Sequence, residues 1–209
     1  MSETAKSAPN PKDPNYPKLA GIVFFMLAIG TGLAYGLFHL DRSKQEIYEA
    51  KFQTLRDGDL QWLYLGLVLL GRTIALLNFV PTGYKNGLKG NVRSNPFFFE
   101  TVEGEKGKKT MVLYQEEGTN GMYNRANRSI QHMVENSGAF FATIGPVGFV
   151  FPKQTCAIVA LFCAGRIIHQ KGYSKQYGKH SLGFVLSVLS ISSVEGLALI
   201  TFLKGAELL

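Results

Sequence analysis

The chain has 209 residues, of which 46% are hydrophobic and 12% are aromatic, and its formal net charge is +7. This length suits one domain, or one domain with a tail. The hydrophobic residues gather in long runs that are nearly free of charge, which excludes an ordinary water-soluble globular protein. We therefore attribute the positive charge to membrane topology and attraction to lipid surfaces, and we expect no nucleic-acid partner.

The N-terminal part of the chain predicts a tail, a membrane helix and a connector. Residues 1–18 are polar and proline-rich, which is typical of a disordered tail. Residues 19–40 carry no formal charge and are long enough to cross a bilayer. Because this run is longer than the apolar core of a secretory signal, we interpret it as a retained helix. In the polar connector at 41–59 we expect a short amphipathic helix around 45–55.

Two later runs are as apolar as the first, and each holds a single charged residue. Residues 62–80 contain Arg72, and residues 181–203 contain Glu195. Charges in the middle of a membrane are costly unless they are paired or functional. We expect Arg72 and Glu195 to form a buried ion pair between adjacent helices, and the alternative is an ion or proton pathway.

Two less regular spans lie between these runs. A polar loop rich in glycine and lysine occupies 81–122, and we expect a small hairpin in it near TMVLYQ. The third span begins in the stretch YNRANRSIQHMVEN, at 123–136, and ends near Pro152. The fourth covers about 154–169. The sequence thus predicts an all-α integral membrane protein with five spans.

The distribution of basic residues favours one orientation of these spans. With the N-terminus in the cytosol, the cytosolic segments carry twelve Lys and Arg residues and the opposite side carries six. The polar stretch 123–136 and the basic segment 170–180 then lie at the same cytosolic edge. Cys156 and Cys163 are seven residues apart on one face of an apolar helix, too far apart along the axis for a disulfide. We interpret both as packing residues and expect no metal site.

The stretch 123–136 places its polar side chains on one helical face. At 100° per residue, about a third of the circumference holds Arg125, Arg128, Gln131, His132 and Glu135. Arginine offers planar paired donors for a carboxylate, and glutamate offers the counter-charge for an ammonium. Such a face suits a small zwitterion with more carboxylates than amines. The alternative is a helix that protrudes above the lipid with its charges in water.

A second polar face follows at the end of the fourth span. Arg166, His169 and Tyr173 recur there at helical spacing. A snorkelling arginine beside an interfacial tyrosine is the alternative interpretation. The convergence of two polar faces on one membrane edge favours a binding site.

These motifs resemble the MAPEG superfamily, the membrane-associated proteins of eicosanoid and glutathione metabolism, and within it the third type of microsomal glutathione transferase. The family pattern in one helix is an Arg, an Asn four residues later and a Glu seven residues later. Arg128 and Glu135 match it, and His132 stands at the Asn position.

A second family pattern, Arg-x-x-Tyr-x-x-Gly-Tyr, is matched by the end of the fourth span. Arg166, Gly172 and Tyr173 fit, and His169 stands at the first Tyr. The resemblance extends over about residues 60–205. It implies a homotrimer of four-helix protomers, so that the helix at 19–40 is one addition to a four-helix transmembrane bundle.

The resemblance also implies glutathione as co-substrate, bound between neighbouring subunits near the cytosolic face, together with a lipophilic co-substrate. Arg128 then pairs with a glutathione carboxylate, Glu135 pairs with the amino group, and Tyr173 contacts the peptide near its cysteine. The remaining implied contact positions are those of His132, Arg166 and His169.

The implied activity is transfer of glutathione to lipophilic electrophiles, or reduction of lipid hydroperoxides, in the endoplasmic reticulum or another internal membrane. A nearby cation must lower the thiol pKa from about 8.5. Catalytic members that resemble this chain use an arginine after Gly-Tyr, where this chain has Lys175, Lys179 and His180. Lys179 and His180 are our candidates for stabilising the thiolate. A non-catalytic member that binds lipid or a partner protein is the alternative.

Overall fold

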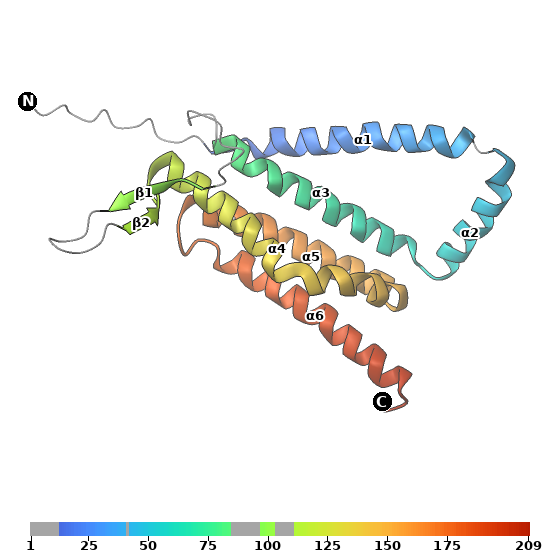
Figure 1. Cartoon of the computed structure of the whole chain (residues 1–209). Coiled ribbons are helices and arrows are strands. Elements are labelled where there is room, and N and C mark those ends of the chain that lie inside the picture. Colours follow the sequence, from blue (N-terminus) through green and yellow to red (C-terminus); the bar gives the residue numbers. More distant parts are fainter. Residues whose placement is uncertain (1–12, 41, 85–96, 103–110) are drawn as a thin grey trace, which may run out of the picture.

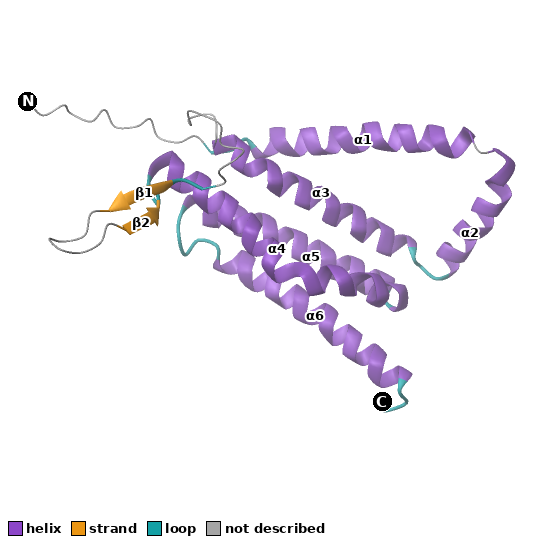
Figure 2. Cartoon of the chain, viewed as in Figure 1, coloured by secondary structure: helices purple, strands orange, loops and turns teal. Residues whose placement is uncertain are grey.

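The computed structural model describes residues 13–40, 42–84, 97–102 and 111–209 (Figures 1 and 2). These residues are mostly helical, with one small antiparallel sheet in which Phe99 pairs with Tyr114. In chain order, the elements are α1 (Tyr16–Leu40), η1 (Arg42–Lys44), α2 (Gln45–Asp57), α3 (Gln61–Tyr84), β1 (Phe99–Val102), β2 (Met111–Tyr114), α4 (Gly118–Val150), α5 (Pro152–Lys175) and α6 (Ser181–Gly205).

Helices α4 and α5 form the centre of the bundle, with α3 on one flank and α6 on the other (Figure 1). The connector helix α2 joins α1 to α3 at one end of the molecule. The β1–β2 hairpin projects from the opposite end, where α3 and α5 end and α4 and α6 begin. Both polar segments singled out in the sequence are therefore at the same end of the bundle.

Among the described residues, three helices are long and apolar enough to cross a membrane, namely α1, α3 and α6. They confirm the predicted spans at 19–40, 62–80 and 181–203. The helices α4 and α5 are not in this set, because each includes a polar segment at the hairpin end of the bundle. That these two helices also cross the membrane stays a prediction.

The central core lies between α3, α4, α5 and α6. Phe140 of α4 stacks on Phe162 of α5, with 4.4 Å between the ring centroids. Cys163 packs in this core, and Cys156 is also buried and free, which confirms the interpretation of both as packing residues. Within lipid, helices associate through such close packing, since the surrounding hydrocarbon is as apolar as the core.

The start of the first span differs from the prediction. Helix α1 begins at Tyr16 because the Asn15 side chain accepts a hydrogen bond from the Lys18 N–H (3.0 Å) and so caps the helix. The prediction of a tail up to residue 18 is therefore wrong for residues 16–18, and residues 1–12 lie outside the described part of the chain.

The polar loop also starts later than predicted. Helix α3 continues through Pro81 to Tyr84, and Val80 and Tyr84 are buried against Tyr123 and Ala126 of α4. This packing keeps the last turn of α3 helical. The hairpin expected near TMVLYQ is confirmed by β1 and β2, and the connector helix is confirmed by α2.

Two helices are longer than predicted. Helix α4 begins at Gly118, before the expected start at 123–136, and α5 extends to Lys175, past the expected end at 169. In both cases the added turns are polar, so hydrophobicity alone did not reveal them. The polar stretch is therefore a continuous part of a helix that also forms the core.

The expected ion pair between Arg72 and Glu195 is not found within the chain. Since α3 and α6 lie on opposite flanks of α4 and α5, they are not the adjacent helices that we expected. In the described part of the chain, none of the ion pairs involves Arg72 or Glu195. Arg72 is half-buried and Glu195 is exposed.

Small residues let α6 approach α5 closely. The buried positions of α6 are Gly183, Ser187, Ser190 and Val194. A Cβ atom on Gly183 would overlap the backbone of His169, so only glycine fits at this crossing. The start of α6 and the polar end of α5 are thereby held in fixed contact.

Gly183→Ala should lower the thermal stability of the purified protein in detergent. Forcing a methyl group into a packed contact costs about 1–3 kcal/mol. Gly196→Ala is the matched control, because Gly196 is on the same helix and nothing lies within 4 Å of its added Cβ. Equal melting temperatures for Gly183→Ala and wild type would contradict this close contact.

Candidate functional site

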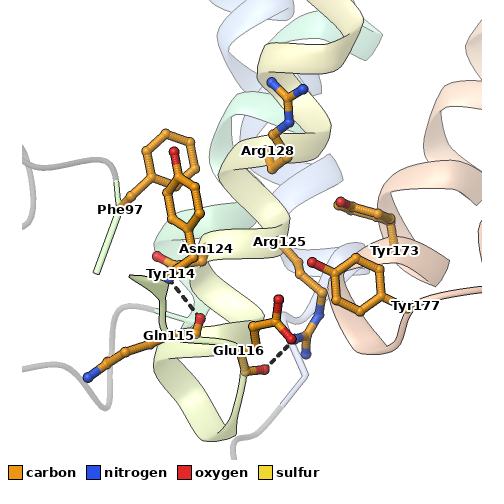
Figure 3. A pocket seen from close by; sticks show the side chains of 9 residues that line it. All are labelled: Phe97, Tyr114, Gln115, Glu116, Asn124, Arg125, Arg128, Tyr173 and Tyr177. Atoms are coloured by element: carbon orange, nitrogen blue, oxygen red, sulfur yellow. Dashed lines mark hydrogen bonds between the residues drawn. The ribbon is translucent and has the colours of Figure 1, made fainter. Parts of the chain in front are cut away.

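A cavity of about 160 Å³ opens where the hairpin meets α4 and the end of α5 (Figure 3). We call it the arginine pocket, because two arginines of α4 contribute to its wall. Arg128 and Tyr173, both predicted site residues, belong to the lining. The full lining is Phe97, Tyr114, Gln115, Glu116, Asn124, Arg125, Arg128, Tyr173 and Tyr177.

Asn124 fixes the hairpin wall of this pocket. Its Oδ1 accepts a hydrogen bond from the Phe98 N–H (2.7 Å), and its Nδ2 donates to the carbonyls of Phe98 (2.7 Å) and Gln115 (2.9 Å). One buried amide thus holds the two backbone segments, before β1 and after β2, that meet at the open end of the hairpin. The rings of Phe97 and Tyr114, the neighbours of Phe98 and Gln115 in the chain, lie 5.2 Å apart between centroids in this wall.

Arg125 joins the start of α4 to the end of α5. Its guanidinium donates to the carbonyls of Glu116 (2.6 Å), Ser174 (3.2 Å) and Lys175 (3.2 Å), and lies 5.8 Å from the centre of the Tyr177 ring. The last carbonyls of a helix lack partners within the helix and carry partial negative charge. Because these acceptors are neutral groups, the positive charge of Arg125 remains in the pocket wall.

Arg128 and Glu135 form an ion pair along the exposed face of α4. The Arg128 Nη1 atom is 3.1 Å from Glu135 Oε1, and the two side chains are 46% and 45% exposed. A surface pair of this kind contributes only about 0–1 kcal/mol. A ligand with a carboxylate and an ammonium group can therefore replace the two partners at little cost.

Four of the predicted residues meet through their rings. His132 stacks on His169 with 5.7 Å between centroids, and His169 stacks on Tyr173 at 5.5 Å. The ring of His180 stands edge-on to His169 (5.2 Å) and to Tyr173 (5.0 Å). We call His132, His169 and Tyr173 the ring stack, and it extends from α4 across the end of α5.

Arg166 and His169 lie outside the pocket lining, in the contact between α4 and α5, where each is only 3% exposed. The buried Ser129 of α4 holds both of them. Its hydroxyl lies 2.9 Å from His169 Nδ1, and its carbonyl accepts a hydrogen bond from Arg166 Nη2 (2.7 Å). The predicted ligand contacts at these two positions are thus engaged by the protein itself.

Three buried nitrogens next to this contact have no hydrogen-bond partner among the described residues: His132 Nδ1, Arg166 Nε and His180 Nδ1. A buried polar atom without a partner costs about 1–3 kcal/mol. Two of them belong to His132 and His180, which were both predicted as site residues, and the His180 ring touches Tyr173 of the pocket lining. Because all three atoms are buried, none of them is open to a ligand in this conformation.

Tyr173 is the predicted residue that links the ring stack to the pocket. It lies in the last turn of α5, beyond the apolar part of that helix. Burial raises the pKa of its phenol, and the neighbouring Tyr177 raises it further. The phenol is therefore neutral at physiological pH and acts as a hydrogen-bond donor.

The two candidates for thiolate stabilisation are placed differently. His180 lies against Tyr173, whereas Lys179 is exposed and does not line the pocket. The Lys179 carbonyl instead packs so closely on Gly172 that a side chain there would overlap it. Lys175, the remaining basic residue of this segment, pairs with Asp13 before α1.

Sequence reasoning did not identify Ser129, Tyr177 or the hairpin residues of the pocket. Tyr177 is four residues after Tyr173, and this helical spacing was the available signal. Ser129 lies about 40° from Arg125 around the helix, at the edge of the charged face, where a small polar residue attracts no attention. The hairpin side chains carried no signal, because their position depends on the long-range bonds of Asn124.

Comparison with known protein families identifies the family of this chain. A sequence model of the MAPEG family matches residues 92–200, just over half of the 209 residues. The matched segment includes the hairpin, α4, α5 and most of α6, and therefore the arginine pocket and the ring stack. No curated protein and no solved structure matches the chain.

Asn124→Ala should release the hairpin from α4. The substitution removes three hydrogen bonds, each contributing about 1 kcal/mol, so amide hydrogen exchange in Phe99–Val102 and Met111–Tyr114 should become faster. Asn127→Ala is the control, since that side chain bonds only the Tyr123 carbonyl of its own helix. Unchanged exchange in the Asn124 variant would show that other contacts hold the hairpin.

Proposed function

The chain belongs to the MAPEG family, and on this basis we propose that it is a glutathione-dependent membrane transferase or peroxidase. Its co-substrates in this proposal are lipophilic electrophiles or lipid hydroperoxides that reach the site from the bilayer. The observation that carries the proposal is the exposed Arg128–Glu135 pair at the edge of the arginine pocket.

The charges at this site suit the backbone of glutathione, which has two carboxylates and one ammonium group. Arg128 is free to bind a carboxylate once Glu135 turns to the ammonium, and Arg125 adds a fixed positive charge to the pocket wall. Arginine binds carboxylates through paired, charge-assisted hydrogen bonds. The pocket is thus better matched to an anionic ligand than to an apolar one.

The size of the pocket supports a site completed by a neighbouring copy. Its volume of about 160 Å³ is below the ~300–1,000 Å³ of most small-molecule sites. A pocket of this size holds only part of a tripeptide such as glutathione. The rest of the ligand would have to be enclosed by residues of the neighbouring copy. In our proposal the protein is a homotrimer with glutathione between subunits, each a four-helix bundle of α3, α4, α5 and α6 with α1 as an added span.

Catalysis in this proposal depends on a glutathione thiolate next to the ring stack. The neutral phenol of Tyr173 donates a hydrogen bond to the sulfur, and the imidazole of His180, which touches that ring, is the second group that stabilises the thiolate. The thiolate attacks the electrophilic carbon of the co-substrate, forming a C–S bond while the leaving group departs or the acceptor takes up a proton.

Location in an internal membrane such as the endoplasmic reticulum, with a cytosolic N-terminus, is part of the same proposal. Cytosolic glutathione then reaches the pocket directly. The basic residues expected on the cytosolic side, including those of segment 170–180, support this orientation.

A non-catalytic member that binds lipid or a partner protein is the second candidate function. It is favoured by the commitment of Arg166 and His169 to Ser129, which removes two implied contacts from the ligand. It is also favoured by the lack of an arginine after Gly172 and Tyr173. In this second candidate function, the site binds a lipid or a partner protein and forms no thiolate.

Arg128→Ala should weaken glutathione binding by the purified protein in detergent. Hydrogen bonds to a charged group contribute about 1.5–3 kcal/mol, which corresponds to roughly tenfold to hundredfold in Kd. Arg56→Ala is the control, because it removes the same charge from α2, away from the pocket. If wild type binds no glutathione, or if both variants bind equally well, the proposed site is wrong.

Thiolate formation separates the two candidate functions. Ultraviolet absorbance of bound glutathione should reveal a thiolate at neutral pH, and His180→Ala should reduce this signal more than Lys179→Ala, since only His180 contacts Tyr173. Glutathione bound without any thiolate signal would favour the non-catalytic member. A larger loss with Lys179→Ala would move the role to the exposed lysine.

A further inference from the structure

The connector helix α2 has an apolar side that the described part of the chain leaves largely open. At 100° per residue, this side holds Ile47, Tyr48, Phe52 and Leu55. Ile47 is 53% exposed and Phe52 is 40% exposed. Every residue of α2 is described, and none of them is buried. An amphipathic helix gains free energy when its apolar side leaves water, so this side of α2 requires a cover.

The opposite side of α2 is polar and bonded within itself. Gln53 Nε2 donates a hydrogen bond to Asp57 Oδ1 (2.7 Å), and Arg56 Nη2 donates one to Gln53 Oε1 (2.9 Å). Glu46 and Glu49 lie on the same side and are exposed. This side of the helix is therefore suited to contact with water.

The two membrane helices that α2 joins fix its position. Helix α1 ends at Leu40 and α3 begins at Gln61, and both helices are long and apolar enough to cross a membrane. The Leu60 N–H donates a hydrogen bond to the Leu55 carbonyl (2.8 Å), which closes the turn from α2 into α3. At the end of the molecule opposite the hairpin, α2 runs across the direction of α1 (Figure 1). It therefore lies at the level at which both spans leave the bilayer.

Ring contacts show which way the apolar side of α2 faces. The centroid of the Phe38 ring is 5.8 Å from that of Tyr48 and 6.1 Å from that of Phe52. Phe38 is in the last turn of the membrane helix α1. Tyr48 and Phe52 are thus on the side of α2 that faces the bilayer, and the polar side faces away from it.

Other side chains at this end of the molecule are typical of a membrane surface. Trp62 and Tyr64 in the first turn of α3 are exposed, and so is Tyr35 near the end of α1. Tryptophan and tyrosine are enriched where lipid headgroups meet acyl chains. Close to them in the chain, Asp59 forms an exposed ion pair with Lys153 at the start of α5 (2.7 Å). Charged and aromatic groups together indicate the headgroup level next to α2.

We propose that α2 is an interfacial helix, with its apolar side inserted between acyl chains at the membrane surface and its polar side in water. The lipid that it contacts is zwitterionic. Segment 41–59 has four Lys and Arg residues and five Asp and Glu residues, so it offers no basic patch for anionic headgroups. This surface goes beyond the proposed function, because it lies at the opposite end of the bundle from the arginine pocket and does not depend on glutathione.

Insertion of α2 also accounts for how the far end of α1 is held. The structure describes all of α1, and Val23 is its one buried residue. Tyr16 and Leu19, at the start of α1, pack against the cluster that includes Tyr84 of α3, whereas residues 28–37 are all exposed. Protein contacts therefore hold the hairpin end of α1, and the contact of α2 with lipid fixes the other end at the membrane surface.

Spin-label accessibility in the full-length chain tests this arrangement. Ile47→Cys and Glu46→Cys are matched variants, because they are neighbours on opposite sides of α2 and both residues are exposed. Each variant is labelled with a nitroxide and reconstituted into phosphatidylcholine vesicles. Electron paramagnetic resonance then measures collisions with oxygen, which concentrates among acyl chains, and with a water-soluble nickel chelate. The unsubstituted chain reports any labelling of the buried Cys156 and Cys163.

The proposal predicts that the oxygen-to-nickel collision ratio is several-fold higher for the label at Ile47 than for the label at Glu46. Equal ratios at the two positions would show that α2 stands in water. A label at Ile47 that is shielded from both reagents would show that protein, and not lipid, covers the apolar side. Either result overturns the proposal.

Two further comparisons test the nature of the contact. Phe52→Glu should lower the collision ratio at Ile47, whereas Gln53→Glu, which adds the same charge on the polar side, should leave it unchanged. Equal effects of these two substitutions would contradict insertion of the apolar side. The ratio should also stay the same when phosphatidylserine is added to the vesicles, and a high ratio that requires this anionic lipid would contradict the zwitterionic partner.

Discussion

The site depends on the polar contact between α4 and α5 that is centred on Ser129. The Ser129 hydroxyl lies against His169, and the Ser129 carbonyl accepts a hydrogen bond from Arg166. One turn before Ser129 on α4, the Ala126 carbonyl accepts a hydrogen bond from Gln170 of α5 (3.0 Å). In apolar surroundings, these groups have no water to replace a lost partner, so only one register of the two helices satisfies them. That register brings Arg128 of α4 and Tyr173 of α5 to the same pocket.

The arrangement divides the arginines of this end of the molecule into two kinds. Arg125 and Arg166 donate to backbone carbonyls and hold helices together, whereas Arg128 is exposed and paired only with Glu135. Exchange of a weak surface pair for a ligand leaves the helix contacts intact. A rigid base with one replaceable ion pair is a reasonable basis for binding a zwitterion, and it requires no rearrangement of the bundle.

Much of the fold followed from the sequence, because hydrophobic runs and helical spacing are local signals. The three apolar spans, the connector helix, the hairpin and the meeting of the two polar segments were all predicted. The depth of Arg166 and His169 was not, since spacing alone cannot tell a side chain that faces a ligand from one that faces Ser129. The pairing of Arg72 with Glu195 was misjudged because their order in the chain does not reveal which helices lie between them.

The central claim is that the arginine pocket recognises a carboxylate of glutathione through Arg128. The most direct measurement compares calorimetric affinities for glutathione and for its glycine amide, which lacks one carboxylate, in wild type and in Arg128→Ala. The account predicts that wild type binds the amide more weakly and that the variant no longer distinguishes the two ligands. Equal affinity of wild type for both ligands, or undiminished discrimination by the variant, would contradict it.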